Sequence, residues 1–333
     1  YKDVDSDKLI EGAINGMLES LDDEHTMYFD KKSKEEFDSE LSGNYYGIGA
    51  QIQLTSDETI KITKVFDNSP AKKAGLKEED VFVSVDGTSV KGKSATEVAN
   101  MLKSDSVKTS TIVVKRNDKE LTFKVTKENI TLFSVSSEML DNNGKNVGYL
   151  SVSIFGQKTY SQFKDALIKL EKQDMDSLII DLRGNTGGYL STVTNMLEEF
   201  IDKGNVIYQI QSSSGVKQYK TVKASEKKYK IVVLIDGGSA SASEIMSAAM
   251  KEVYGATLVG QTTYGKGTVQ TTKNLSNGSM IKYTIEKWLT PSGKNIDKEG
   301  IKPDCEVELG DSYKNNPTKE NDAQLQKALD LLK

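Results

Sequence analysis

Cysteine, histidine and arginine are scarce in this chain of 333 residues. The single cysteine, Cys305, excludes an intrachain disulfide and a cysteine-based metal cluster. The single histidine, His25, lies in the acidic stretch Asp22-Asp-Glu-His25 and reads as a solvated surface residue; a Ser–His–Asp triad would have to recruit it from there. Only two arginines, Arg116 and Arg183, stand against 42 lysines.

Long apolar runs are also missing. Because no run reaches 18 apolar residues, the sequence predicts no membrane-spanning helix. The net charge of −5 comes from interspersed acidic and basic residues, so no basic face for nucleic acid is indicated. No pattern of metal ligands or of a cofactor site is visible. The length suffices for two or three domains, each with its own core.

The most informative stretch begins with a buried strand. The apolar run Ile231–Asp236 ends at Gly237-Gly238, and Ser239–Glu244 then leads into a helical segment, Ile245–Val253. This order places Ser241 at a helix N-terminus, where free N–H groups can hold a developing oxyanion. Ser241-x-x-Glu244 is equally a helix capping box, and this segment alone favours the cap.

Lys266 changes that balance. It lies between two glycines, and Gln270 follows four residues later, a spacing that puts both side chains on one side of a helix or strand. A buried lysine whose pKa falls by about three units, or about 4 kcal/mol, can act as a general base to a serine. Gln270 could accept a hydrogen bond from the amine and orient it. The alternative is a surface lysine in a turn.

The motif Ser-Ala-Ser-Ala-Ser-Glu-Ile, followed by Gly-Lys-Gly-Thr-Val-Gln, resembles the C-terminal processing peptidases, also called tail-specific proteases. Motif, order and spacing all agree with that family, with 25 positions from Ser241 to Lys266. The resemblance implies that Ser241 is the nucleophile, Lys266 its base and Gln270 the residue that orients the lysine.

The segment Asp181-Leu-Arg-Gly-Asn-Thr-Gly-Gly188 is similar to a loop of the same family. By that resemblance, Gly188 supplies one N–H of an oxyanion hole, and Ala242 supplies the second. From the residues alone, the segment is equally a plain strand–helix connection or an anion-binding nest. We expect Arg183 and Asp181 to be paired and to hold the loop.

Residues 45–128 are similar to a PDZ domain, through Ser-Pro-Ala-x-x-Ala-Gly-Leu, Asp-x-Val and Val-Asp-Gly in that order. Such a domain binds a peptide as an added strand, and a glycine loop takes the terminal carboxylate. The matching loop is Tyr46-Gly47-Ile48-Gly49. Arg116 ends a predicted strand. It either couples peptide binding to the protease core, as in some relatives, or discourages edge-strand aggregation.

The predicted architecture is multidomain α/β. Alternating strands and helices after Ile130 indicate an α/β core, which the resemblance implies is a crotonase/ClpP-like protease core. We expect an N-terminal helical segment at 1–44, the PDZ domain at 45–128 (mostly β with two helices), the core at 129–310 and a C-terminal helical segment at 311–333.

The helices at the two chain ends carry apolar faces with no obvious place in one core. Because such helices join subunits in relatives, we expect a homodimer through them. The start, Tyr1-Lys-Asp-Val, lacks a methionine. Because members of the family that the chain resembles usually carry an export signal or membrane anchor before this point, the resemblance implies that such a segment precedes it, as in a bacterial, extracytoplasmic protein. The residues of the two faces are Leu9, Ile14 and Met17, and Leu325, Leu329 and Leu332.

Taken together, these observations predict a serine endopeptidase that cuts accessible protein tails through an acyl-enzyme on Ser241 and needs no cofactor. One alternative is a non-catalytic protein whose PDZ domain binds peptides. The other is a crotonase-like acyl-CoA enzyme, which also uses an oxyanion hole. Neither alternative requires the spacing of Ser241, Lys266 and Gln270.

Overall fold

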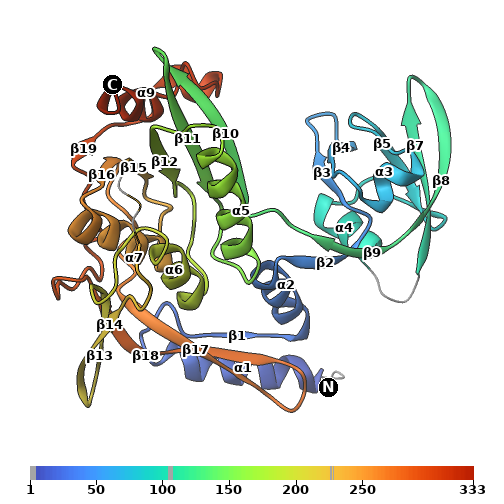
Figure 1. The fold of residues 1–333 in the computed structure, drawn as a ribbon. Helices are drawn as coiled ribbons and strands as arrows, with labels where there is room; N and C mark the ends of the chain where they lie inside the picture. Colours follow the sequence, from blue (N-terminus) through green and yellow to red (C-terminus); the bar gives the residue numbers. More distant parts are fainter. Residues whose placement is uncertain (1–4, 104–107, 226, 228) are drawn as a thin grey trace. The chain divides into compact units, whose positions relative to one another are not determined.

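The computed structural model describes residues 5–103, 108–225, 227 and 229–333, which form two compact units (Figure 1). One unit runs up to Gly43 and resumes at Phe133, and the other comprises Asn44–Leu132. The second unit therefore begins one residue before the predicted PDZ-like stretch, 45–128, and ends four residues after it. The terminal segments 1–44 and 311–333 lie almost entirely in the first unit.

The first unit is built on a six-stranded sheet. Its edge pair, β10 and β11, is antiparallel, and every later neighbour is parallel. Strand β12 is buried along its whole length, as expected for a parallel strand covered on both faces. The predicted α/β core is thus confirmed. The strands in spatial order are β10 (Val135–Asn142), β11 (Lys145–Val152), β12 (Ser177–Asp181), β15 (Lys230–Ile235), β16 (Thr257–Gly260) and β19 (Cys305–Glu306).

Helices cover both faces of this sheet. Because side chains alternate along a strand, Val233 of β15 packs with one helical layer, whereas Val232 and Leu234 pack with the other. The first layer comprises α5 (Thr159–Glu171), α6 (Leu190–Leu197) and α7 (Ala242–Ala249), which continues into a π-helical turn, η1 (Met250–Tyr254). The second layer is α9 (Ala323–Leu331).

The C-terminal helix corrects one expectation. Leu325, Ala328 and Leu332 are buried against β15 and β16 of the same chain, so the apolar face of α9 does have a place in the core. The sequence missed this because the strands that cover α9 lie about 70–95 residues earlier. A homodimer cannot use that face without unpacking it.

A second, five-stranded sheet joins the N-terminal part of the chain to its last third. The short strand β1 pairs antiparallel with β18, with Met27 opposite Lys282. A three-residue strand whose partner lies some 250 positions away leaves no local signal in the sequence. The strands are β1 (Met27–Phe29), β18 (Met280–Leu289), β13 (Val206–Ser212), β14 (Gly215–Lys220) and β17 (Thr268–Asn274).

Two helices flank β1. Helix α1 (Ser6–Glu19) leaves apolar side chains exposed, including Leu9 and Met17. Helix α2 (Lys31–Ser42) begins after Asp30, whose side chain caps it by accepting a hydrogen bond from the Ser33 N–H (2.7 Å). Near the other end of the chain lies a short helix, α8 (Asp311–Asn315). Within the described residues, none of the helices has the length and hydropathy needed to cross a membrane.

The second unit contains the two helices and the β-rich fold that the sequence predicted for it. Strands β3 to β8 form one sheet around a core of aliphatic side chains, and β2 pairs with β9. The elements are β2 (Asn44–Gly47), β3 (Ala50–Leu54), β4 (Ile60–Val65), α3 (Pro70–Ala74), β5 (Val81–Val85), β6 (Thr88–Ser89), α4 (Ala95–Lys103), β7 (Thr109–Arg116), β8 (Lys119–Thr126) and β9 (Glu128–Thr131).

Arg116 is held inside this second unit. Its Nε and Nη2 atoms donate to the two carboxylate oxygens of Asp80 (2.5 and 2.6 Å), and Nη2 also donates to the Gly75 carbonyl (2.9 Å). The Asp80 side chain is fully buried, so the arginine neutralises a carboxylate that water does not reach. Arg116 is therefore more than an exposed edge-strand charge.

Candidate active site

The turn that carries Ser241 connects β15 to α7 through residues 236–241. Ser241 has φ 54° and ψ −112°, a conformation that is rare for a residue with a side chain and costs roughly 1–3 kcal/mol. Such a sharp strand-to-helix turn exposes a hydroxyl at the helix N-terminus. Ser239 supports the turn because its hydroxyl donates to the Leu182 carbonyl (2.8 Å). The strain at Ser241 is thus maintained by its surroundings.

Two backbone N–H groups near Ser241 have no hydrogen-bond acceptor among the described residues: those of Gly188 and Ala242. Ala242 is the first residue of α7, so its N–H has no helical partner. Gly187 packs so closely that a Cβ on it would lie 2.9 Å from Cβ of Ser241 and 3.1 Å from N of Ala242. Gly188 has φ 137° and abuts the Phe155 backbone. Both glycines are required by this close approach.

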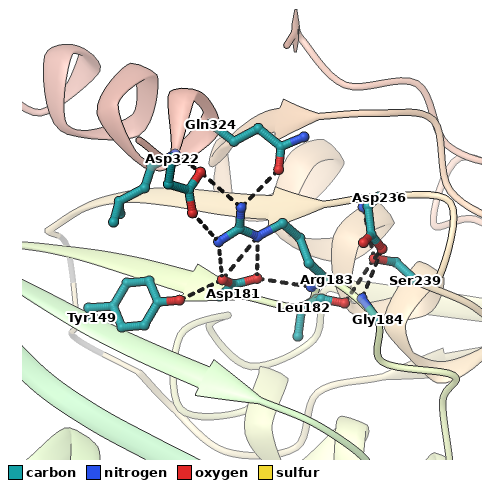
Figure 2. Close-up of polar contacts among 10 residues, drawn as sticks. Tyr149, Asp181, Leu182, Arg183, Gly184, Asp236, Ser239, Asp322 and Gln324 are labelled. Carbon is teal, nitrogen blue, oxygen red and sulfur yellow. Dashed lines mark hydrogen bonds and ion pairs between the residues drawn. The ribbon is translucent and has the colours of Figure 1, made fainter. Parts of the chain in front are cut away.

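Arg183 anchors the loop that carries these glycines (Figure 2). Its Nε and Nη2 atoms donate to Asp181 (3.0 and 2.6 Å), which also accepts the Tyr149 hydroxyl (2.6 Å). Its Nη1 atom donates to Gln324 (2.9 Å), and Nη2 lies 2.9 Å from an oxygen of Asp322. The expected pairing of Arg183 and Asp181 is confirmed, and it extends to the C-terminal helix.

A buried carboxylate, Glu244, joins the turn that carries Ser241 to the loop before β17, which carries Lys266. One oxygen accepts the N–H groups of Ser241 (2.8 Å) and Lys266 (2.9 Å). The other accepts the Thr263 hydroxyl (2.6 Å) and the Gly265 N–H (2.7 Å). Burial raises the pKa of Glu244, and the four hydrogen bonds oppose that rise. The glutamate reaches back to Ser241 as a capping box requires, while also holding a second loop.

Lys266 lies in the loop before β17 and is partly buried. Burial, assisted by the charge of Lys282, lowers the pKa of Lys266 to about 8, and the carboxylates of Glu244, Asp23 and Glu24 oppose that fall. Its ammonium group makes no hydrogen bond or ion pair within the part of the chain that the structure describes. The backbone is fixed instead, because its carbonyl accepts the Trp288 indole N–H (2.7 Å).

Gln270 lies on β17 opposite Thr284 of β18. Its amide nitrogen donates to the hydroxyls of Thr268 (2.8 Å) and Thr284 (3.2 Å). These two contacts occupy the nitrogen and leave the carbonyl oxygen as the acceptor that could receive Lys266. No hydrogen bond between Gln270 and Lys266 occurs among the described side chains.

One cleft of about 660 Å³ in the first unit brings these residues together. Ser241, Lys266 and Gln270 all line it, as does Gly188. No hydrogen bond joins Ser241 and Lys266 in the described structure. The remaining wall comes from helix α2, the glycine loop and strands β17 and β18, including Phe37, Leu41, Tyr189, Thr272 and Lys282.

The sequence did not indicate that the turn before β1, which carries His25, lies near Lys266. The side chain of His25 is only 15% exposed, which corrects the expected solvated histidine. Burial and the nearby charge of Lys266 lower the pKa of His25. The Thr26 hydroxyl accepts the Thr284 N–H (3.3 Å), so the turn is bound to β18, whose Thr284 also contacts Gln270. Only the pairing of β1 with β18 could have revealed this.

The remaining predicted site residues lie in the second unit. Tyr46 and Gly47 end β2, and Ile48 and Gly49 form the connection to β3. Gly49 has φ 76°, and a Cβ on it would lie 2.4 Å from Cβ of Ser69, so this loop requires glycine. No group of three or more potential metal ligands converges anywhere among the described residues.

Comparison with known proteins gives a consistent assignment. Residues 146–307 match the model of peptidase family S41, 46–126 match the PDZ domain, and 1–33 match the N-terminal domain of the activating protease CtpB. Two relatives from Bacillus subtilis (strain 168) are the carboxy-terminal processing proteases CtpA and CtpB, 39% and 38% identical over 94% of this chain. The chain spans 67% and 66% of their lengths, about two thirds.

A solved structure of similar fold is the photosystem II D1 C-terminal processing protease. It is 28% identical, has a TM-score of 0.56, and the match covers 90% of this chain and 81% of that one. This likeness extends over both units of the chain.

The four hydrogen bonds of Glu244 predict that its replacement lowers the free energy of unfolding of the first unit. In Glu244→Gln, an amide NH₂ would face two N–H donors, so the first unit should lose about 2–5 kcal/mol of unfolding free energy. Urea unfolding followed by fluorescence measures this unit selectively, because Trp288 is the only tryptophan and is buried there. The control is Glu252→Gln, which removes a carboxylate that accepts one exposed N–H, from Ser292. Equal midpoints for the two variants would contradict the prediction.

Proposed function

The chain belongs to the C-terminal processing proteases of peptidase family S41, with a PDZ domain, and on that premise we propose that it is a serine endopeptidase cutting protein substrates at or near their C-terminal tails. Ser241 attacks the scissile carbonyl and forms an acyl-enzyme. The observation that carries this proposal is the shared cleft, which is lined both by a strained serine at a helix N-terminus and by a partly buried lysine whose ammonium group has no partner among the described residues. Membership of this protease family argues against the two alternatives, a peptide-binding scaffold and an acyl-CoA enzyme.

Lys266 is the proposed general base. With a pKa of about 8, roughly a tenth of the side chain is neutral at pH 7, and the neutral amine accepts the proton of the Ser241 hydroxyl. It returns this proton to the leaving amine. Gln270 orients the amine through its carbonyl oxygen, since threonines hold its nitrogen. The hydrogen bond between Ser241 and Lys266 forms when substrate binds, since catalytic hydrogen bonds often become short only in the substrate complex.

The N–H groups of Gly188 and Ala242 are the proposed oxyanion hole. The closeness of Gly187 to Ser241 and Ala242 supports this, because the loop and the helix N-terminus meet beside the hydroxyl. Two fixed donors stabilise the tetrahedral intermediate without reorganising, which typically lowers the barrier by several kcal/mol. The same arrangement, loop plus helix N-terminus beside a parallel sheet, supports a crotonase/ClpP-like description of the core.

The catalytic assignment predicts that Ser241→Ala and Lys266→Ala lose at least about 10³-fold in peptide hydrolysis while the fold stays intact. Gln270→Ala should lose less, about 10- to 100-fold, because it orients rather than reacts. Digestion of an unstructured protein, followed by mass spectrometry, measures this. Lys273→Ala, an exposed lysine on β17, is the control and should cut normally. Full activity of either main variant, with matched thermal melts, would overturn the assignment.

The PDZ domain is proposed to recognise the substrate C-terminus through Tyr46, Gly47, Ile48 and Gly49, and to raise the activity of the protease unit when occupied. Arg116 is the proposed gating residue. Because Asp80 binds two of its nitrogens, only Nη1 lacks a hydrogen bond among the described residues. Any gating therefore has to use that nitrogen or break a buried ion pair.

Gating predicts activation by a peptide that is not cut. A separate peptide with a free apolar C-terminus should speed hydrolysis of a substrate too short to reach the PDZ groove, by about 5- to 150-fold. An amidated peptide should do so less. Arg116→Lys keeps a cation beside Asp80 and should bind the peptide normally by calorimetry, yet respond less. Pure inhibition by the peptide, or a wild-type response of Arg116→Lys, would leave simple tethering as the role.

A homodimer through helix α1 is also proposed, now without α9. The exposed fractions of Leu9 and Met17 are 62% and 64%, so these two apolar side chains of α1 lie uncovered in the described structure. An extracytoplasmic location, with a membrane anchor outside this chain, is proposed from the family resemblance. The proposed partners are protein tails and a second copy of the chain, without cofactor or nucleic acid.

The dimer proposal predicts a concentration-dependent mass. Light scattering at tens of micromolar, a range suited to micromolar association, should give a dimer for the wild-type chain. The double variant Leu9→Glu/Met17→Glu should be monomeric because it places charges on the apolar face. Val222→Glu, at a residue 67% exposed elsewhere, is the control and should stay dimeric. A wild-type monomer at these concentrations would refute the proposal.

A further inference from the structure

Two lysines, Lys266 and Lys282, line the same cleft. Both are partly buried, and neither ammonium group has a hydrogen bond or an ion pair among the described residues. This contrasts with many other lysines of the chain, which pair with carboxylates near the surface, such as Lys61 with Glu79. Two unpaired cations in one partly desolvated pocket are costly, so their retention requires an explanation.

The position of Lys282 is fixed by aromatic rings. Its Nζ atom lies 5.5 Å from the centroid of the Phe29 ring and 5.7 Å from that of Phe37. These rings pack together with centroids 5.1 Å apart, and the pairing of β1 with β18 places Met27 opposite Lys282. A cation over aromatic faces is attracted by their quadrupoles without being neutralised. Burial lowers the pKa of Lys282 and the nearby carboxylate of Asp23 opposes that fall, while the two rings contact the ammonium group without neutralising it.

We propose that Lys282 is a positioning residue of the reaction, held over Phe29 and Phe37 so that its positive charge keeps Lys266 in the neutral form that can deprotonate Ser241. The inference rests on the proposed role of Lys266 as base. A cation next to a second cation disfavours the charged form of both, a device that activates lysines in other enzymes. No contact of Lys282 with the substrate is needed.

Charged groups face Lys266 from three elements. Glu244 of α7 and the turn residues Asp23 and Glu24 favour the protonated lysine, whereas Lys282 of β18 opposes it. A charged His25 would oppose it too, but burial and the charges of Lys266 and Lys282 lower the pKa of His25 and so disfavour its charged form. Lys282 is therefore the one charge in the described cleft that favours the base at neutral to alkaline pH.

The test is the pH profile of kcat/KM between pH 6 and 10, with a blocked peptide substrate that has no ionisable group in that range. In the wild type, activity should rise through a midpoint near the pKa of Lys266, about 8. In Lys282→Met, the midpoint should move up by roughly half a unit to one unit. Activity would then fall up to about tenfold at pH 7 and return to wild type at pH 10.

Two variants are matched to this one. Lys282→Arg carries a permanent charge over the same rings, so its midpoint should not exceed that of the wild type. Lys273→Met removes an exposed lysine from the neighbouring strand β17 and should leave the profile unchanged. Urea unfolding followed by Trp288 fluorescence shows whether each variant is folded.

Each other outcome has a definite meaning. An unshifted midpoint in Lys282→Met, with a higher KM at every pH, overturns the proposal and makes Lys282 a substrate-binding cation. A downward shift overturns it as well. Failure of the underlying function is separate: Lys266→Ala would then retain activity, or the wild-type profile would lack the alkaline rise.

Discussion

The arrangement of the cleft depends on one buried carboxylate. Glu244 accepts four hydrogen bonds, one from the N-terminus of α7 and three from residues 263–266, and so joins that N-terminus to the loop before β17. A backbone hydrogen bond from the Tyr264 N–H to the Ser239 carbonyl (3.0 Å) joins the same two segments. A buried carboxylate is stable when its oxygens are satisfied, so the same contacts that fold the loop also position Ser241 and Lys266.

Arginine is used only where its planar fork is needed. Each of the two arginines grips a buried aspartate with two nitrogens: Arg116 holds Asp80 in the PDZ unit, and Arg183 holds Asp181 beneath the glycine loop. The 42 lysines cannot provide this bidentate geometry. Arg183 also reaches Asp322 and Gln324, so the C-terminal helix supports the loop that approaches Ser241. The last residues of the chain thus contribute to the site.

The cleft combines opposing electrostatic demands. The proposed general base, Lys266, must be neutral part of the time, yet the carboxylates of Asp23, Glu24 and Glu244 favour its protonated form. Burial and the cation of Lys282 act in the other direction, and the net result is a pKa of about 8. Phe29 and Phe37 hold Lys282 without neutralising it, which a carboxylate could not do. The aromatic pair therefore allows a second charge to remain in the pocket.

The sequence by itself determined the features that depend on near neighbours: the turn at Ser241, the glycines around Lys266, the spacing to Gln270, and the strands of the PDZ unit. Only the tertiary structure decided the rest. The pairing of β1 with β18 brings the turn of His25 near Lys266, Arg183 binds the C-terminal helix, and α9 finds its place on the sheet. These contacts join residues 100 to 250 positions apart in most cases, and no local pattern encodes such pairings because their energy arises only when the chain has folded.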